Sequence, residues 1–197
     1  MPRQVFFYDP PERFVAGAVG QPGERTFFLQ ARGSGRMTSV ALEKFQVASL
    51  AQRIEELLDE VLRRSEGSAV VPAVAPADLK DNEPLDQPIL EEFRVGTMAL
   101  AWDPEDERVV IEAQAATEEA EEGQEEEEFE PFTDEVTEGP DVLRVSITPG
   151  EARAFAQRAL KIVAAGRPPC PFCGQPLDPD GHICPRQNGQ RRSTLVT

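Results

Sequence analysis

The chain is 197 residues long and contains only one histidine, three cysteines, one tryptophan and one tyrosine. Nucleophilic catalysis by a Ser-His or Cys-His pair needs a histidine base, and in the second case a cysteine nucleophile. The one histidine and all three cysteines fall within residues 170–184, in a pattern typical of metal ligation. If these residues bind metal, Ser-His, Cys-His and histidine-phosphotransfer mechanisms are excluded, and only carboxylate, Lys, Arg, Ser, Thr and tyrosine chemistry remains.

The chain also lacks a long apolar run and a glycine-rich phosphate loop. A membrane-spanning helix needs about 18 consecutive apolar residues, and no segment approaches that length. The apolar start at residues 1–8 is too short for a signal peptide. We therefore expect a cytoplasmic protein. Arg32-Gly33-Ser34-Gly35-Arg36 is not followed by a helix start, and we predict a hairpin loop there rather than an anion-binding turn.

The clustered cysteines and histidine predict a metal site. Cys170 and Cys173 form a Cys-x2-Cys pair, and His182 and Cys184 follow as His-x-Cys. Thiolate and imidazole are the ligands that a tetrahedral Zn²⁺ prefers. Gly174 lets the backbone turn back toward the sulfur atoms. Since four candidate ligands lie in one short loop, no position stays open for water, and the zinc is expected to be structural.

Two other uses of these cysteines are open but fit less well. A redox-active Cys-x-x-Cys pair would leave Cys184 and His182 without a role, and no thioredoxin-like strand and helix flank it. An iron–sulfur cluster usually takes four cysteines. The zinc interpretation accounts for all four residues.

Charge is distributed unevenly along the chain. Residues 1–53 carry 7 basic and 4 acidic groups, and residues 150–197 carry 7 and 3. Residues 54–149 carry 6 and 29, which gives the middle of the chain a net charge of −23. The acidity is greatest at about 117–138, where repulsion between carboxylates and the scarcity of apolar residues predict a disordered insertion. The simplest role is solubilising, and a sharper alternative is a decoy that competes with polyanions for basic surfaces.

Hydrophobic periodicity predicts an α+β fold built from two pseudo-repeated βββα units with antiparallel sheets. The expected strands are 14–19, 25–31, 37–42, 93–102, 108–115 and 142–147. An amphipathic helix is expected after each set of three, over 45–64 and 150–165. Thr148-Pro149-Gly150-Glu151 is typical of a capping box at the start of the second helix.

The second unit repeats part of the first at an offset of 105 residues. Ala51-Gln52-Arg53 then aligns with Ala156-Gln157-Arg158, and apolar positions before it also align. We hypothesise an internal duplication. The resulting division is a first βββα unit at 1–64, a linker and irregular segment at 65–92, a second unit at 93–166 with the acidic insertion, and a zinc-binding knob at 167–197.

Three segments carry a resemblance to a known family. They are Arg3-Gln-Val-Phe-Phe-Tyr-Asp9 with Phe14-Val-Ala-Gly17, Glu92-Phe-Arg-Val-Gly-Thr-Met98 with Ala101-Trp-Asp103, and Cys170–Arg186. Together they resemble an actinobacterial family of uncharacterised proteins, the domain of unknown function 3090. The resemblance covers nearly the whole chain. It implies no activity, since none is established for that family.

Three functions are consistent with these features. The first is a zinc-stabilised accessory or adaptor protein that binds a protein partner through exposed aromatic side chains. The candidate anchors are Phe6, Phe7, Tyr8 and Trp102, although filling the core is the commoner role for such residues.

The second function is nucleic-acid binding through the zinc knob and nearby arginines. The candidate arginines are Arg186, Arg191, Arg192, Arg25, Arg32 and Arg36. The third is a carboxylate- or metal-dependent hydrolase or phosphoryl-transfer enzyme. Its candidate acids are Asp81, Glu83, Glu91, Glu92 and Asp103, but the segment 78–86 more often forms a solvated loop. The adaptor is preferred, and no residue is assigned as catalytic.

Overall fold

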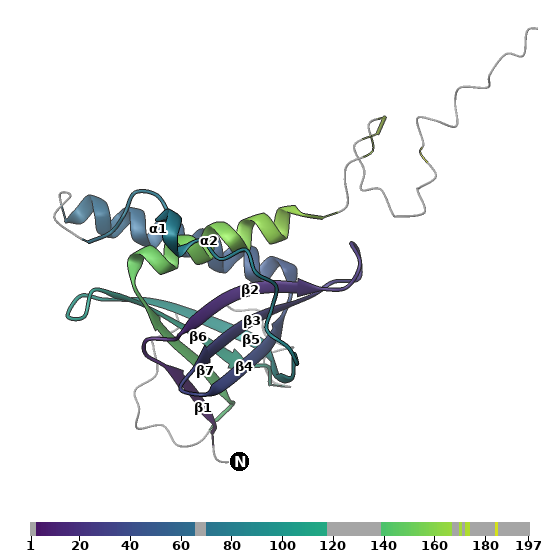
Figure 1. The fold of residues 1–197 in the computed structure, drawn as a ribbon, viewed down its shortest axis with the longest axis horizontal. Coiled ribbons are helices and arrows are strands. Elements are labelled where there is room, and N and C mark those ends of the chain that lie inside the picture. Colours follow the sequence, from purple (N-terminus) through teal and green to yellow (C-terminus); the bar gives the residue numbers. More distant parts are fainter. Residues whose placement is uncertain are drawn as a thin grey trace, which may run out of the picture.

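The computed structural model describes residues 3–65, 70–117, 139–166, 170, 172, 173 and 184. These residues form seven strands, two α-helices and one turn of 3-10 helix (Figure 1). The strands are β1 (Val5–Tyr8), β2 (Arg13–Val19), β3 (Thr26–Gly33), β4 (Arg36–Leu42), β5 (Glu91–Asp103), β6 (Arg108–Ala115) and β7 (Val142–Ile147). The helices are α1 (Lys44–Arg64) and α2 (Pro149–Ala164), and η1 (Ala77–Leu79) is the 3-10 turn.

All seven strands belong to one mixed sheet, in the order β1-β7-β6-β5-β4-β3-β2. The two predicted antiparallel meanders are present, as β2-β3-β4 and β5-β6-β7. The expectation of separate antiparallel sheets is wrong, because β4 and β5 pair in parallel and β1 pairs in parallel with β7. Pairing β4 with β5 satisfies backbone groups that would otherwise lie at two open edges.

The sheet is strongly curled. Strands β1 and β2 lie at its opposite edges, which in a flat sheet would be about 29 Å apart at about 4.8 Å per strand. Residues 9–12 connect them, and five extended residue steps reach at most about 18 Å. The edges must therefore approach each other. The Tyr8 hydroxyl of β1 is 2.7 Å from Thr38 Oγ1 of β4, across the inside of the curve.

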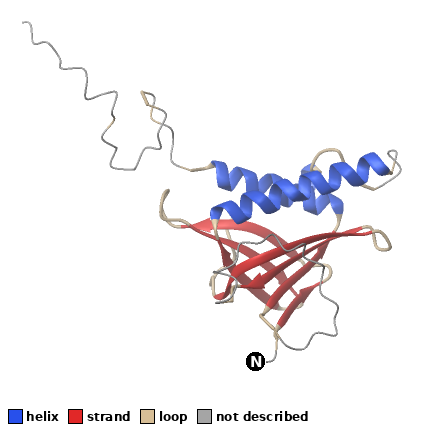
Figure 2. Cartoon of the chain, turned by 180° about the vertical axis from the view of Figure 1, so that it is seen from behind, coloured by secondary structure: helices blue, strands red, loops and turns tan. Residues whose placement is uncertain are grey.

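Helices α1 and α2 lie against one side of the curled sheet (Figure 2). The predicted face of α1 is buried, including Val47, Leu50, Ala51, Ile54 and Leu58. At the start of α2 the predicted capping box is confirmed. The Glu151 amide donates to Thr148 Oγ1 at 3.3 Å, and the Thr148 amide donates to Glu151 Oε2 at 2.8 Å.

A buried arginine joins the two helices. Arg153 of α2 is only 2% exposed and donates to Glu55 and Asp59 of α1. Its Nε also donates to the Pro72 carbonyl oxygen at 3.2 Å. A buried guanidinium without acceptors would be costly, so moving any of these groups away from Arg153 is unfavourable. The contacts therefore keep α1, α2 and Pro72 in one arrangement.

Residues 85–89 cover part of the outer face of the first meander. Leu85 packs there with Val15, Phe28 and Ala41, which alternate along their strands with core residues. A Cβ on Gly17 would lie 2.4 Å from Leu85 Cγ, so only glycine fits beneath this side chain. Gln30 Oε1 accepts a hydrogen bond from the Asp86 amide at 2.8 Å, and Gln30 Nε2 donates to the Asp86 carbonyl oxygen at 3.1 Å. Part of segment 78–86, expected as a solvated loop, is thus packed against the sheet.

The turn at residues 32–36 is a tight hairpin, as predicted. Gly33 pairs with Arg36, and both central residues have positive φ, 52° at Ser34 and 72° at Gly35. This combination is the type I′ geometry that matches strand twist. The hairpin is therefore part of the sheet and not a phosphate loop.

The order β-β-β-α occurs twice, in β2–α1 and in β5–α2. Residues aligned by the offset of 105 occupy matching elements, since Val40 and Val145 are buried in the third strand of each set. Leu50 and Phe155 likewise are buried in the following helices. Common origin of the two units, and the four-segment division of the chain, stay predictions. Residues 118–138 of the predicted acidic insertion are not among the described residues.

Candidate functional site

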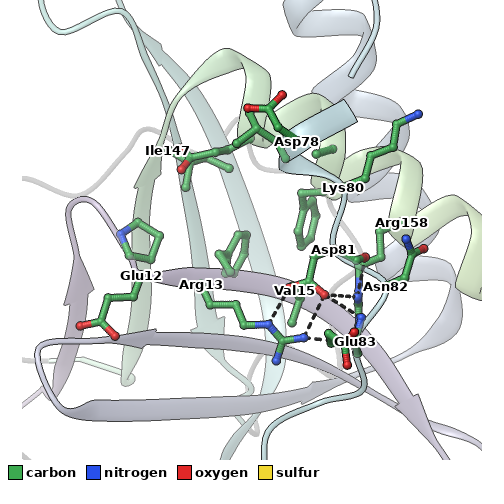
Figure 3. A pocket seen from close by; sticks show the side chains of 16 residues that line it. Glu12, Arg13, Val15, Asp78, Lys80, Asp81, Asn82, Glu83, Ile147 and Arg158 are labelled. Carbon is green, nitrogen blue, oxygen red and sulfur yellow. Dashed lines mark hydrogen bonds and ion pairs between the residues drawn. The ribbon is translucent and has the colours of Figure 1, made fainter. Parts of the chain in front are cut away.

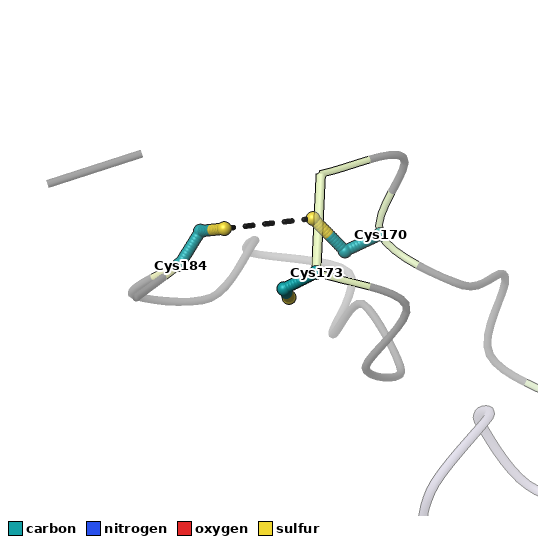
Figure 4. A group of neighbouring side chains, drawn as sticks. All are labelled: Cys170, Cys173 and Cys184. Atoms are coloured by element: carbon teal, nitrogen blue, oxygen red, sulfur yellow. Dashed lines mark hydrogen bonds between the residues drawn. The ribbon is translucent and has the colours of Figure 1, made fainter. Parts of the chain in front are cut away.

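Three of the four predicted metal ligands come together after α2. The sulfur atoms of Cys170, Cys173 and Cys184 all lie within 4.8 Å of one another (Figure 4). Cys170 and Cys184 are buried, and Cys173 is partly exposed. None of the three is in a disulfide. His182 lies outside the described residues, so the position of the fourth predicted ligand is not described.

The spacing of the sulfurs suits metal ligation. Cys170 Sγ and Cys184 Sγ are 3.9 Å apart, whereas a disulfide would place them at about 2.05 Å. Two thiolates bound at about 2.3 Å to one tetrahedral ion are separated by about 3.8 Å, as the tetrahedral angle requires. The observed separation is close to this value. Three cysteines in this arrangement can hold a metal ion.

Basic side chains approach the end of α2. This helix precedes the cysteine segment, by which we mean residues 170–184. Arg25, in the connection between β2 and β3, donates from Nη1 to the Ala165 carbonyl oxygen at 2.5 Å. Lys44 Nζ would lie 3.6 Å from a Cβ on Gly166. Cations at a helix C-terminus offset the partial negative charge of its last carbonyls. Arg25 and Lys44 therefore stabilise the end of α2.

A second candidate site is a pocket of about 460 Å³ between the start of β2, residues 78–83 and α2 (Figure 3). Its lining includes Phe14 and Phe155, whose rings stack with centroids 4.6 Å apart. Asp81 lies between Arg13 and Arg158. It accepts from Arg13 Nε at 2.6 Å and from Arg158 Nη1 at 2.8 Å. The pocket combines aromatic rings with charged groups, which is the composition typical of ligand-binding sites.

The contacts of these arginines indicate a structural role instead. Every nitrogen of both guanidinium groups lies near a protein oxygen. Besides Asp81, these oxygens belong to Asp86 and to the carbonyls of Ala16, Glu83 and Pro84. Arg13 Nη1 is buried and makes no hydrogen bond, although it lies 3.1 Å from Asp86 Oδ1. The other contacts fasten segment 81–86 to β2 and α2.

Electrostatics keeps the Asp81 carboxylate ionised. Its hydrogen bond from Arg13 is the largest cause that lowers the pKa of Asp81 below its ordinary value. The same bond raises the pKa of Arg13, whereas burial lowers the pKa of Arg158. A carboxylate held in this way is a poor proton donor near neutral pH, which weakens it as a general acid.

The other predicted catalytic acids do not gather around Asp81. Glu91 and Glu92 begin β5, while Asp103 ends it and accepts from the amides of Glu105 and Asp106 in the following turn. Only Glu83 joins Asp81 in the pocket lining. The predicted acids are therefore spread along the chain instead of forming one site.

The predicted aromatic anchors divide into three groups. Phe6 and Tyr8 are buried in the core, which is the commoner role expected for them, and so they are not exposed anchors. Trp102 is partly buried and packs against that core. Phe7 points to the other face of β1, as alternation in a strand requires, and is 48% exposed. Of the four predicted anchors, Phe7 is the one left open to a partner.

The described arginines of the nucleic-acid hypothesis make contacts within the chain. Arg32 pairs with Asp86 at 2.8 Å, and Arg36 lies 5.8 Å from the centre of the Tyr8 ring. Arg25 bonds the end of α2, as described above. The remaining three arginines, at 186, 191 and 192, lie outside the described residues. Intramolecular contacts leave Arg25 and Arg32 less available for phosphate groups.

Arg13, Arg158 and Arg153 were not recognised as important from the sequence. A signal was present for the two arginines of α2, since they interrupt a run of small and apolar residues on an amphipathic helix expected to pack on a sheet. A charge at such a position needs a partner. Nothing local to Arg13 identified Asp81, which is 68 residues away.

None of the helices in the described part of the chain has the length and apolar character needed to cross a bilayer.

The described residues define an α+β protein with one curled mixed sheet, two helices and a cysteine cluster able to hold a metal ion. The chain belongs to the family described as protein of unknown function (DUF3090), whose profile matches residues 6–184. No curated protein and no solved structure matches the chain.

Proposed function

We propose that this chain is a zinc-stabilised accessory or adaptor protein that binds a protein partner. One structural Zn²⁺ is held by Cys170, Cys173, His182 and Cys184. The observation that carries the proposal is the cluster of three sulfurs within 4.8 Å. The cytoplasm is the proposed location, because thiols stay reduced there.

Ligand chemistry favours zinc over other metals. Thiolates with one imidazole form a soft, four-ligand set that Zn²⁺ accepts in tetrahedral geometry. Iron–sulfur clusters usually take four cysteines, and the chain has three. A full ligand set leaves no position for an activated water, which supports a structural role for the metal.

Two exposed apolar residues support a protein partner. Val5 and Phe7 lie on the same face of the edge strand β1, and they are 46% and 48% exposed. Aromatic side chains are enriched at the centres of protein interfaces. Since most donors of the Asp81 network are occupied by internal contacts, this face is a better candidate for function than the pocket.

Metal content tests the first half of the proposal. Protein purified without chelators should hold about one Zn²⁺ per chain by plasma mass spectrometry. Cys173→Ser and His182→Ala should each lower this content, and Ser65→Ala, which removes a hydroxyl far from the cluster in sequence, serves as control. Iron in place of zinc, or no metal in reduced protein, would contradict the metal site.

A pull-down from lysate tests the second half. The intact chain should retain a defined protein, and Phe7→Ser should lose it. Phe45→Ser is the matched control, because Phe45 is also exposed, at 71%, but lies at the start of α1. The experiment is run with and without nuclease. Loss of binding only after nuclease would favour the nucleic-acid alternative, and turnover of a phosphate ester would favour the enzyme.

A further inference from the structure

The cysteine cluster has one accessible sulfur-bearing residue and two buried ones. Cys170 and Cys184 are 5% and 2% exposed, whereas Cys173 is partly exposed. Any of the three sulfurs can reach another by a small movement, because all lie within 4.8 Å. A diffusing oxidant therefore meets Cys173 first, with two resolving cysteines beside it.

From this arrangement we infer that the cysteine cluster is a redox switch that releases its metal when a hydroperoxide oxidises Cys173. The inference rests on the proposed zinc site. It adds to that site a reactant, a hydroperoxide, and a response, the release of the metal ion. The structural zinc is then present only while the cysteines are reduced.

The reaction balances in two steps. The Cys173 thiolate attacks a peroxide oxygen, so that an S–O bond forms, the O–O bond breaks and an alcohol or water leaves after taking up a proton. Cys170 or Cys184 then attacks the sulfur of the sulfenic acid, which forms an S–S bond and expels hydroxide that is protonated to water. Two thiolates lose two electrons in total, and the hydroperoxide gains them.

Metal binding would favour the first step, and the second step removes ligands that the metal needs. A metal ion keeps its cysteine ligands deprotonated, and the thiolate is the form that reacts. A disulfide removes two of the four proposed ligands. One thiolate and one imidazole then remain, too few for the tetrahedral set that structural zinc requires.

The structural consequence is confined to the end of the chain. Cys170 and Cys184 are buried but belong to neither hydrophobic cluster of the sheet and helices. Loss of metal should therefore unfold the cysteine segment and leave the core intact.

Zinc release is measured with a chromogenic chelator after hydrogen peroxide is added to reduced, zinc-loaded protein. We expect one zinc per chain to be released, with a mass loss of two hydrogens, and to rebind after dithiothreitol and zinc are added. Peptide mapping should find Cys173 in the first disulfide formed.

Two matched variants test the role of Cys173. Cys173→His and Cys184→His each replace a thiolate with another zinc ligand and leave two cysteines. Release from Cys173→His should be at least about tenfold slower than from the wild type, because its remaining thiolates are buried. Cys184→His should keep a rate within about threefold of wild type, since Cys173 and Cys170 remain.

Equal release rates in the two variants would overturn the inference, as would retention of zinc by the wild type under excess peroxide. If either variant binds no zinc, mapping of the wild-type disulfide decides instead, and a first disulfide between Cys170 and Cys184 overturns it. Zinc content before oxidation separately tests the proposed metal site. Zinc that is present but insensitive to peroxide contradicts only the switch.

Discussion

The sheet-and-helix core and the cysteine segment are stabilised by different physical means. The core buries Leu29, Val40, Ile54 and Ile111 almost completely and joins residues far apart in sequence. The cysteine segment gathers three sulfurs from within fifteen residues, outside both hydrophobic clusters. Burial stabilises the first region cooperatively, whereas metal coordination must stabilise the second. The two regions should therefore respond independently to mutation and to metal.

Removal of the metal should produce the largest effect. Cys173→Ser, or treatment with a strong chelator, should remove about 10 kcal/mol of metal-coupled folding free energy from the cysteine segment. Hydrogen exchange should then become fast around Cys170 and Cys184. The melting temperature of the core, followed by circular dichroism, should stay within a few degrees. A large fall in that temperature would show that the regions depend on each other.

A cavity in the core should have the converse effect. Leu29 of β3 is fully buried, and Leu29→Ala should lower the free energy of unfolding by about 2–5 kcal/mol. Denaturant titration measures this change, and zinc content should not alter. Leu90→Ala is the control, because Leu90 is 66% exposed and should change stability by less than about 0.5 kcal/mol. Similar losses in both variants would contradict the burial pattern.

Gly17→Val tests the packing of Leu85 on the outer face of the first meander. The new side chain would collide with Leu85, whose Cγ lies 2.4 Å from the added Cβ. We expect a loss of about 1–3 kcal/mol from overpacking. Combining it with Leu85→Ala should cost less than the sum of the two single changes, since the collision is relieved. Strict additivity in a double-mutant cycle would contradict the contact.

Asp81→Asn should weaken the core mainly above acidic pH. The folded state lowers the pKa of Asp81, chiefly through Arg13, so this carboxylate contributes stability that is present above its unfolded pKa of about 3.9. That contribution is lost as pH falls through the lower folded pKa. The variant should lose about 1–2 kcal/mol at pH 7 and approach the wild type as acid is added. A constant difference down to pH 2 would contradict the assignment.

Deletion of residues 117–135 should have the smallest effect on stability. The deletion removes eleven acidic groups from the predicted disordered insertion. Closure entropy depends weakly on loop length, by about 0.6 kcal/mol per doubling. Calorimetry should therefore show a nearly unchanged melting temperature. If the insertion is a decoy, the deleted protein should also bind RNA more tightly at low salt, as measured by fluorescence anisotropy.

Elements with a strong local pattern were predicted well. The six expected strands and both helices occur within two residues of their predicted bounds. The hairpin at 32–36 and the capping box of Thr148 and Glu151 also agree. Glycine at a positive φ and a polar side chain at a helix start act over a few residues, so a single sequence reveals them.

Features that depend on distant residues were missed. Nothing in the short run 5–8 indicated that β1 would pair with β7, more than 130 residues later. The same holds for the Asp81 bonds to Arg13 and Arg158. Such contacts follow from chain topology, which local periodicity does not encode.

The sequence alone determined six of the seven strands and both helices of the core, because these depend on side chains close together along the chain. It also placed the predicted metal-ligand residues within fifteen positions of each other. The tertiary structure decided that two meanders share one curled sheet through β4 and β5, and that three cysteine sulfurs lie within 4.8 Å. It also decided which aromatic residues are buried, since burial depends on what covers a side chain and not on its own type.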